Sequence, residues 1–197
     1  YYVAQINVLQ SFGEKDEAKL TAQLKKARDF INEAKFNSMD NPEIMVLDAQ
    51  WYTAWIVFDG QQYGMIYSGK ASELYQNALK IAPDNPNASL SIGKLYYSDG
   101  DLENAAFFFE KAINADMTDP QGYILRGRAL HKLGKMDEAM EDYNAAIRLD
   151  AQAGEAYLYR GALKASLKKN KAACLDLEKA KSLGVEAATE ALAKYCK

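Results

Sequence analysis

Few residues in this chain of 197 interrupt regular structure, since it contains only 4 Pro and 12 Gly. An all-β protein needs a turn about every eight to twelve residues, and each turn draws on these residue types. The scarcity excludes that class. It favours long helices joined by short loops, and the chain is long enough to bury a substantial core.

Residues that carry chemistry are equally scarce, with one His and two Cys. His131 has no second imidazole to share a metal ion, and no phosphate-binding glycine loop or paired-cysteine zinc pattern occurs. Carboxylate pairs such as Glu141/Asp142 lie on expected outer faces, whereas acid–base catalysis needs groups that converge in a desolvated cleft. We therefore expect no enzyme, no catalytic residue, no metal and no cofactor.

Excess charge of one sign and long apolar runs are also missing. The net charge is −3, which does not suit a nucleic-acid partner. The sequence has no run of 18 apolar residues, the length that a membrane-spanning helix needs. The charge is uneven, with −4 over residues 86–119 and +4 over residues 154–197. Solvated helix faces explain such a gradient, but opposite ends could also promote head-to-tail contact, so a self-assembling scaffold is one candidate role.

The start of the sequence leaves the compartment open. The first residue is Tyr1 rather than Met, and Tyr1–Gln10 has neither the basic nor the apolar region of a leader. We expect that an upstream segment has been removed, which could be a signal peptide, a lipoprotein leader or a cloning boundary.

The most informative feature is a period of 34 residues. Gly93, Gly127 and Gly161 keep this spacing. Three further columns share it: Ala105, Ala139 and Ala173; Phe109, Tyr143 and Leu177; Ala112, Ala146 and Ala180. A glycine inside a helix costs about 1 kcal/mol against alanine, so its recurrence implies close backbone contact between two helices. The alanines let a helix pair cross tightly, and the large residue fills the space toward the next repeat.

In these columns the chain resembles the tetratricopeptide repeat (TPR) family. The resemblance implies an all-α, right-handed solenoid of antiparallel helix pairs, with a capping helix at the C-terminal end. The expected segments are a divergent helical pair and the start of a long helix at 1–51, a degenerate repeat at 52–85, repeats at 86–119, 120–153 and 154–182, and the capping helix at 183–197.

The N-terminal part is less regular. Apolar residues at helical spacing predict helices at about 14–36 and 42–58, preceded by another over 1–11. The apolar period then dissolves between Asp59 and Gly69, where we expect an ordered loop. A long loop can be functional, so a second candidate role is a receptor for a small molecule or saccharide that uses the aromatic region 51–67, with Trp51, Trp55, Tyr63 and Tyr67.

The two cysteines flank a break at Gly184, ten residues after Cys174 and twelve before Cys196. An antiparallel helix pair folded at Gly184 would bring them within reach of a disulfide. Free buried thiols would be equally ordinary there. The tail also resembles the ending of TPR proteins of bacterial cell envelopes, which implies an oxidising periplasmic or envelope location, with the cytoplasm as the alternative.

The TPR resemblance implies a concave groove lined by the first helix of each repeat. Mapped onto this chain, the candidate partner-binding residues are Lys94, Tyr97, Gln121, Arg128, His131 and Tyr159. Such a surface suits a partner protein or an extended peptide, and this is the leading function predicted. The Lys and Asn clamp of TPR domains that hold the acidic end of chaperones is replaced here by Leu90, Lys94, Leu125, Glu155 and Tyr159. Chaperone cofactor activity of that type is disfavoured.

Overall fold

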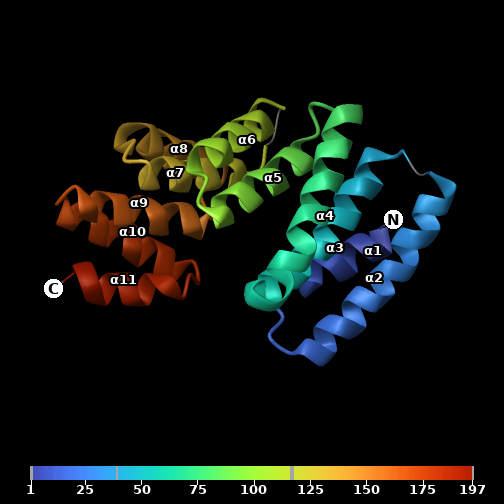
Figure 1. The fold of residues 1–197 in the computed structure, drawn as a ribbon. Helices are drawn as coiled ribbons and strands as arrows, with labels where there is room; N and C mark the ends of the chain where they lie inside the picture. The colour runs from blue at the N-terminus through green and yellow to red at the C-terminus, as the bar shows by residue number, and fades with distance from the viewer. Residues whose placement is uncertain (1, 39, 116–117, 197) are drawn as a thin grey trace. The chain divides into compact units, whose positions relative to one another are not determined.

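The computed structural model describes residues 2–38, 40–115 and 118–196. These ranges consist of α-helices and the turns between them, and they contain no strand (Figure 1). The helices are α1 (Tyr2–Ser11), α2 (Glu17–Asn37), α3 (Pro42–Phe58), α4 (Gly60–Ile81), α5 (Pro86–Asp99), α6 (Leu102–Asn114), α7 (Gln121–Lys132), α8 (Met136–Leu149), α9 (Gly154–Ser166), α10 (Asn170–Ser182) and α11 (Ala187–Tyr195). Tyr1 and Lys197, the ends of the first and last expected segments, lie outside the described residues. The all-α class is confirmed.

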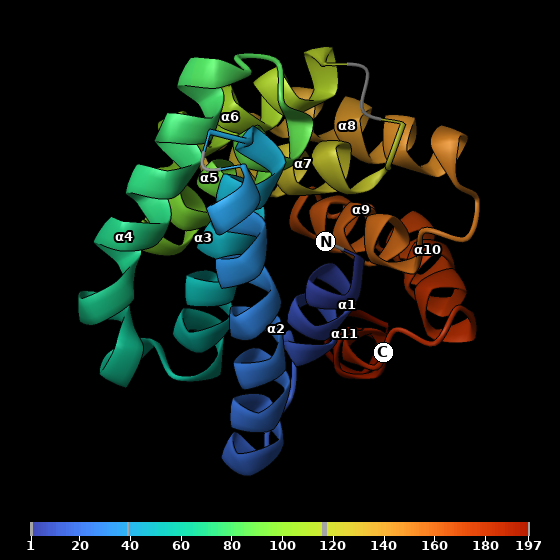
Figure 2. The ribbon, with the colours of Figure 1, turned by 90° about the vertical axis from the view of Figure 1, so that its right-hand side faces the viewer.

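The helices divide into two compact units, Tyr1–Leu95 and Tyr96–Lys197. In the first unit α1, α2 and α3 pack on one another, and α4 lies alongside α3 (Figures 1 and 2). Its core joins fully buried side chains of three helices, among them Val8, Leu24, Ile31 and Leu47. The helix over 42–58 begins and ends where the sequence predicts, because Pro42 occupies its first turn and the Asn41 side chain caps it.

A charged group is buried inside this first unit. Asp48 is 1% exposed, and its two carboxylate oxygens lie 2.7 Å from Arg28 Nη1 and 2.8 Å from Lys35 Nζ. The Arg28 guanidinium also stacks 3.8 Å from the ring centroid of Trp51. Because both oxygens are paired, the carboxylate can be buried without leaving an uncompensated charge.

The prediction of an ordered loop at 59–69 is wrong, because α4 begins at Gly60. The Asp59 side chain caps this helix by accepting hydrogen bonds from the backbone N–H groups of Gln61 and Gln62. Tyr63 and Tyr67, one turn apart, stack on each other with ring centroids 5.8 Å apart, and the Tyr63 ring lies 4.9 Å from that of Trp55 in α3. These contacts stabilise a helix whose glycines would otherwise disfavour it.

The second unit confirms the columns of the 34-residue period. Phe109, Tyr143 and Leu177 are each 0% exposed, as are the six alanines that flank them in α6, α8 and α10. The turns between paired helices also recur at this spacing, since Gly100, Gly134 and Lys168 all have positive φ. Lys168 therefore adopts in the last repeat a left-handed conformation that glycine provides in the two preceding ones.

Two glycines of the period lie where the sequence requires close helix contact. A Cβ atom on Gly127 would come 2.7 Å from Cε1 of Tyr143, and one on Gly161 would come 2.9 Å from Leu177 Cδ2 and 3.2 Å from the carbonyl oxygen of Ala173. Paired helices can approach this closely only where the side chain is absent.

We expect Gly161→Ala to lower the free energy of unfolding by about 1–2 kcal/mol, because overpacking a rigid core outweighs the gain in helix propensity. Gly64→Ala on α4 is the matched control, since no heavy atom lies within 4 Å of the added methyl group. It should raise stability by up to about 1 kcal/mol. Denaturant unfolding followed by circular dichroism measures both, and equal effects of the two substitutions would contradict the close contact.

The C-terminal helix α11 packs against α9 and α10, as expected for a cap. Ala188 of α11 joins the core cluster that contains Leu158, Leu177 and Ala180. The structure forms a disulfide between Cys174 and Cys196, with their Cα atoms 5.8 Å apart. This bridge ties the residue that follows α11 to the first half of α10.

Candidate functional site

One side chain from each of three successive first helices meets on one face of the second unit. Tyr97 lies in the last turn of α5, Arg128 lies in α7 and Tyr159 lies in α9. The Arg128 guanidinium carbon is 5.1 Å from the ring centroid of Tyr97 and 4.5 Å from that of Tyr159. Lys132, one turn after Arg128, places Nζ 4.4 Å from the Tyr97 ring. We call these four residues the tyrosine–arginine face.

Tyr143 is a buried residue that packs beneath the ring of Tyr159 in this face. It is 0% exposed, and its ring centroid lies 6.3 Å from that of Tyr159. Within the described residues its hydroxyl is buried without a hydrogen-bond partner. Burial raises the pKa of Tyr143 and of Tyr159, and the nearby Arg128 charge opposes both shifts. Tyr143 and Tyr159 therefore stay neutral at pH 7, and the positive charges of the face are those of Arg128 and Lys132.

The other predicted groove residues lie around α5 and α7. Gln121 opens α7 and its backbone N–H donates to Asp119 Oδ1, whereas His131 is half-buried near the end of that helix. Burial lowers the pKa of His131, so it is neutral at pH 7. Lys94 is an exposed residue of α5 in the first unit. Binding by these residues remains a prediction.

Sequence reasoning missed Lys132 and Tyr143 as members of this site. Lys132 could have been found from its spacing, because it follows Arg128 by one helical turn and so shares its face. Tyr143 was interpreted as a packing residue of the repeat, which it also is. Only the structure shows that its ring packs beside that of Tyr159.

The aromatic region at 51–67, the other candidate site, forms a packed cluster between α3 and α4. Its rings contact one another, with centroids of Trp51 and Trp55 6.1 Å apart and those of Tyr52 and Tyr67 5.3 Å apart. The Trp51 indole N–H donates to the carbonyl oxygen of Leu24 at 2.7 Å. These rings join the two helices, and a ligand-binding role for them remains a prediction.

An arginine–aspartate pair recurs in the last two repeats at the 34-residue spacing. Arg126 binds Asp142 through two hydrogen bonds of 2.9 and 2.6 Å, and Arg160 binds Asp176 through two of 2.8 Å. Lys164 adds a third contact to Asp176 at 2.7 Å. The expectation that Asp142 lies on an outer face is wrong, because Asp142 and Asp176 are both buried as partners of these arginines.

The two aspartates should titrate on opposite sides of their ordinary pKa of 3.8. Burial raises the pKa of Asp142, and Arg126 only partly offsets it. At Asp176 burial is outweighed by hydrogen bonds from Arg160 and Lys164, so its pKa is lowered. Stability from Asp176 is therefore present above pH 3.8 and is lost as the pH falls through its lower folded-state pKa, whereas ionised Asp142 opposes folding above its raised pKa.

Carboxyl carbon NMR of the folded protein measures both midpoints. We expect Asp142 to titrate at the higher pH, and Lys164→Met to raise the pKa of Asp176. A midpoint of Asp176 at or above that of Asp142 would contradict this order.

No group of three or more His, Cys, Asp or Glu side chains in residues 2–38, 40–115 and 118–196 has the arrangement that could hold a metal ion. Within the same ranges, no helix combines the length and the apolar character needed to cross a bilayer.

Two family profiles match the chain. The profile described as TPR repeat matches residues 69–100 and 127–168, and the one described as Tetratricopeptide repeat matches residues 86–117. Comparison of the sequence with the curated proteins finds no match.

Solved structures of this fold resemble the chain over different lengths. MamA of Desulfovibrio magneticus RS-1, solved from residue 41 to its end, is 19% identical with a TM-score of 0.64, over 91% of this chain and 94% of the solved one, and this likeness shows the fold alone. The TPR2B domain of yeast Sti1, in complex with pHsp70, is 28% identical with a TM-score of 0.50, over 55% of this chain and 87% of that domain. The first TPR of Spaghetti, bound to the HSP90 peptide SRMEEVD, is 28% identical with a TM-score of 0.53, over 56% and 89%.

Proposed function

Because this chain is a tetratricopeptide-repeat protein, we propose that it is a non-enzymatic interaction module whose tyrosine–arginine face binds an extended segment of a partner protein. TPR domains are protein–protein interaction modules, and the similar Sti1 and Spaghetti domains are in complex with pHsp70 and an HSP90 peptide. The single observation that carries the proposal is the convergence of Tyr97, Arg128 and Tyr159 from three successive first helices.

The chemistry of this face favours a segment that carries carboxylates. The Arg128 guanidinium presents a planar fork of donors that matches a carboxylate, and Lys132 adds a second charge on the same helix face. Tyr97 and Tyr159 hold the guanidinium between their rings, so little rotamer entropy is lost when it binds. Both rings also offer contact area to apolar side chains beside the acidic ones.

Selection from a displayed library of acidic, extended peptides tests this function. We expect Arg128→Met to weaken binding of the selected peptides about tenfold to a hundredfold, because a charge-assisted hydrogen bond contributes about 1.5–3 kcal/mol. Arg148→Met on α8 is the matched control, since this arginine is exposed on a second helix of the same unit. Equal binding by wild type and Arg128→Met, measured by fluorescence anisotropy, would place the site elsewhere.

The peptide SRMEEVD serves as a specificity probe. Leu90, Leu125 and Glu155 stand where chaperone-binding TPR domains carry clamp residues, so this peptide should bind weakly or not at all. Tight binding of SRMEEVD would overturn the proposed difference from that subfamily.

The compartment is part of the proposal. The disulfide between Cys174 and Cys196 supports an oxidising location, and a periplasmic or envelope complex fits it better than the cytoplasm. Alkylation of the protein in intact cells, followed by mass analysis without reductant, is the test. Two alkylated thiols would favour the cytoplasm.

A further inference from the structure

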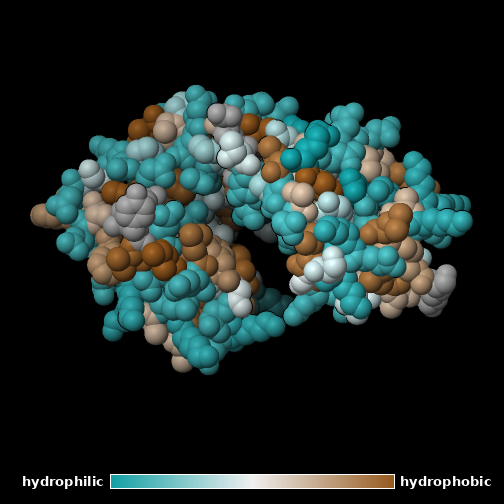
Figure 3. All heavy atoms as spheres, turned by 180° about the vertical axis from the view of Figure 1, so that it is seen from behind, coloured by the Kyte–Doolittle hydropathy of each residue, from teal (hydrophilic) through white to brown (hydrophobic). Residues whose placement is uncertain are grey.

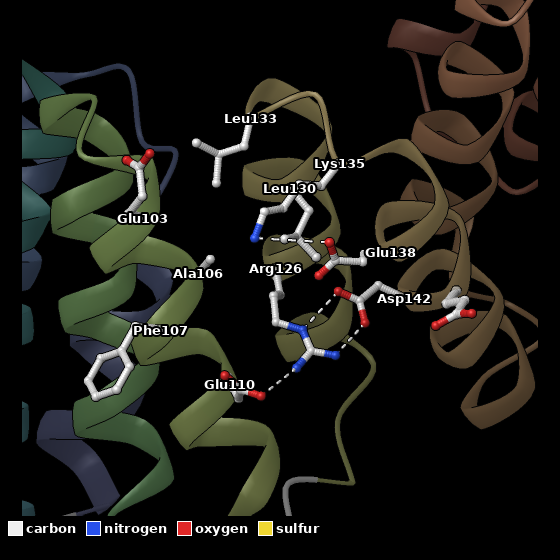
Figure 4. Close-up of a pocket in the computed structure, with 11 residues that line it drawn as sticks. Glu103, Ala106, Phe107, Glu110, Arg126, Leu130, Leu133, Lys135, Glu138 and Asp142 are labelled. Carbon is white, nitrogen blue, oxygen red and sulfur yellow. Dashed lines mark hydrogen bonds and ion pairs between the residues drawn. The ribbon is translucent and has the colours of Figure 1, made fainter.

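A cleft of about 430 Å³ is lined by residues of α6, α7 and α8 (Figure 4). Arg126 and Leu130 of α7 and Leu133, which directly follows this helix, line it together with residues of α6 and α8. Arg126 and Arg128 are two positions apart on one helix, so their side chains leave it about 200° apart. The cleft is therefore a separate surface from the tyrosine–arginine face.

The cleft has an excess of carboxylates. Five acidic side chains line it against two basic ones. Arg126 is already engaged by Asp142 and, at 3.7 Å, by Glu110, and Lys135 lies 4.0 Å from Glu138. Within the described residues, Glu103 and Glu141 take part in no ion pair. The cleft can therefore accept further positive charge.

An exposed aromatic ring lies beside these carboxylates. Phe107 of α6 lines the cleft and is 54% exposed, and the side chains of Leu130 and Leu133 add apolar surface to the lining. Apolar side chains of this kind interrupt a mostly hydrophilic surface (Figure 3). A complementary surface would carry cations around one apolar side chain.

Such a surface occurs on α10 of the same unit. Leu175 is 68% exposed, with Lys171 one turn before it and Lys179 one turn after it. Lys168 and Lys169 extend the basic stripe at the start of the helix, and all four lysines are exposed. None of these lysines forms an ion pair with another residue in the described part of the chain. We call Lys171, Leu175 and Lys179 the α10 stripe.

We propose that the cleft of one copy binds the α10 stripe of a second copy, with Leu175 placed against Phe107 and the lysines against the acidic rim. Within one copy α10 packs against α9 and α11 and has no packing contact with α6 or α8, so the partner must be another molecule. The two surfaces differ, so the contact is heterologous and propagates head to tail. Because it leaves the tyrosine–arginine face free, it goes beyond the proposed peptide binding.

Sedimentation velocity at several protein concentrations tests this proposal on the whole chain. Wild type should associate at low ionic strength and dissociate at high salt, because the contact relies on charges near the surface. Glu138→Lys/Glu141→Lys and Lys171→Glu/Lys179→Glu should each weaken association about tenfold or more. An equimolar mixture of the two variants should assemble again, since each reversed surface then meets its complement.

The control is Lys25→Glu/Lys26→Glu on α2, which changes the net charge as much as the reversal on α10 does but lies in the other unit. It should associate like wild type. Circular dichroism confirms that each variant is folded, and the variants should bind library-selected peptides as wild type does. Wild type that stays monomeric at all salt concentrations, a mixture that fails to assemble, or an equal loss in the control would overturn the proposal.

Discussion

Replacing Leu177 with alanine is expected to lower the free energy of unfolding of the C-terminal repeats by about 3 kcal/mol. Leu177 is 0% exposed and belongs to the core cluster that joins α9, α10 and α11. It also contacts the backbone of α9 closely, because Gly161 leaves no side chain between them. Neighbours held by two helices and a disulfide cannot collapse into the space, so the cavity remains.

Leu175→Ala on the same helix is the matched control, because Leu175 is 68% exposed and loses little burial. Its effect on stability should stay within about 0.5 kcal/mol. Both substitutions are compared at high salt, where the proposed contact between copies is suppressed. Circular dichroism is the appropriate readout, because both tryptophans lie in the first unit and do not report on α10. Equal losses in the two variants would contradict the buried role of Leu177.

The core of the second unit could be predicted from the sequence because the same core positions recur in three consecutive repeats. Positions 109, 143 and 177 each hold a large apolar side chain between alanines, and each is fully buried. Every helix pair solves the same local packing problem with neighbours close in sequence. The period therefore identified the packing residues as well as the helices.

The segment 59–69 could not be predicted in the same way. Three glycines and the loss of apolar periodicity indicate a loop by local rules. The helix forms because Tyr63 and Tyr67 contact rings of α3, which lies before the turn at Asp59. Such contacts depend on how two helices pack, and local propensity does not contain that information.

The acidic cleft escaped prediction because three helices contribute its lining. Glu103, Arg126 and Glu141 are widely separated in sequence, and each by itself is an ordinary charged residue of an amphipathic helix. The tyrosine–arginine face was partly predictable, since the family pattern gives the register of the first helices. That register does not predict that Arg128 contacts the rings of both Tyr97 and Tyr159.

Loss of the disulfide is expected to have an effect of similar size to that of Leu177→Ala. Cys174 and Cys196 are separated by 22 residues, and closing a loop of this length restricts the unfolded chain by about 3 kcal/mol. The α11 helix has 9 residues, which is too short to be stable alone in water. Cys174→Ser/Cys196→Ser should therefore lower the free energy of unfolding by about 3 kcal/mol.

The loss should begin at the C-terminal end. Without the bridge α11 is held only by contacts such as that of Ala188 with the core, so its amide protons should exchange faster than those of α7 and α8. Hydrogen exchange on the oxidised protein and on the double variant separates this local opening from a general loss of stability. The α2 amides of the first unit are the internal control. If exchange in α11 were unchanged while α2 exchanged faster, the bridge would not be what holds the C-terminal helix in place.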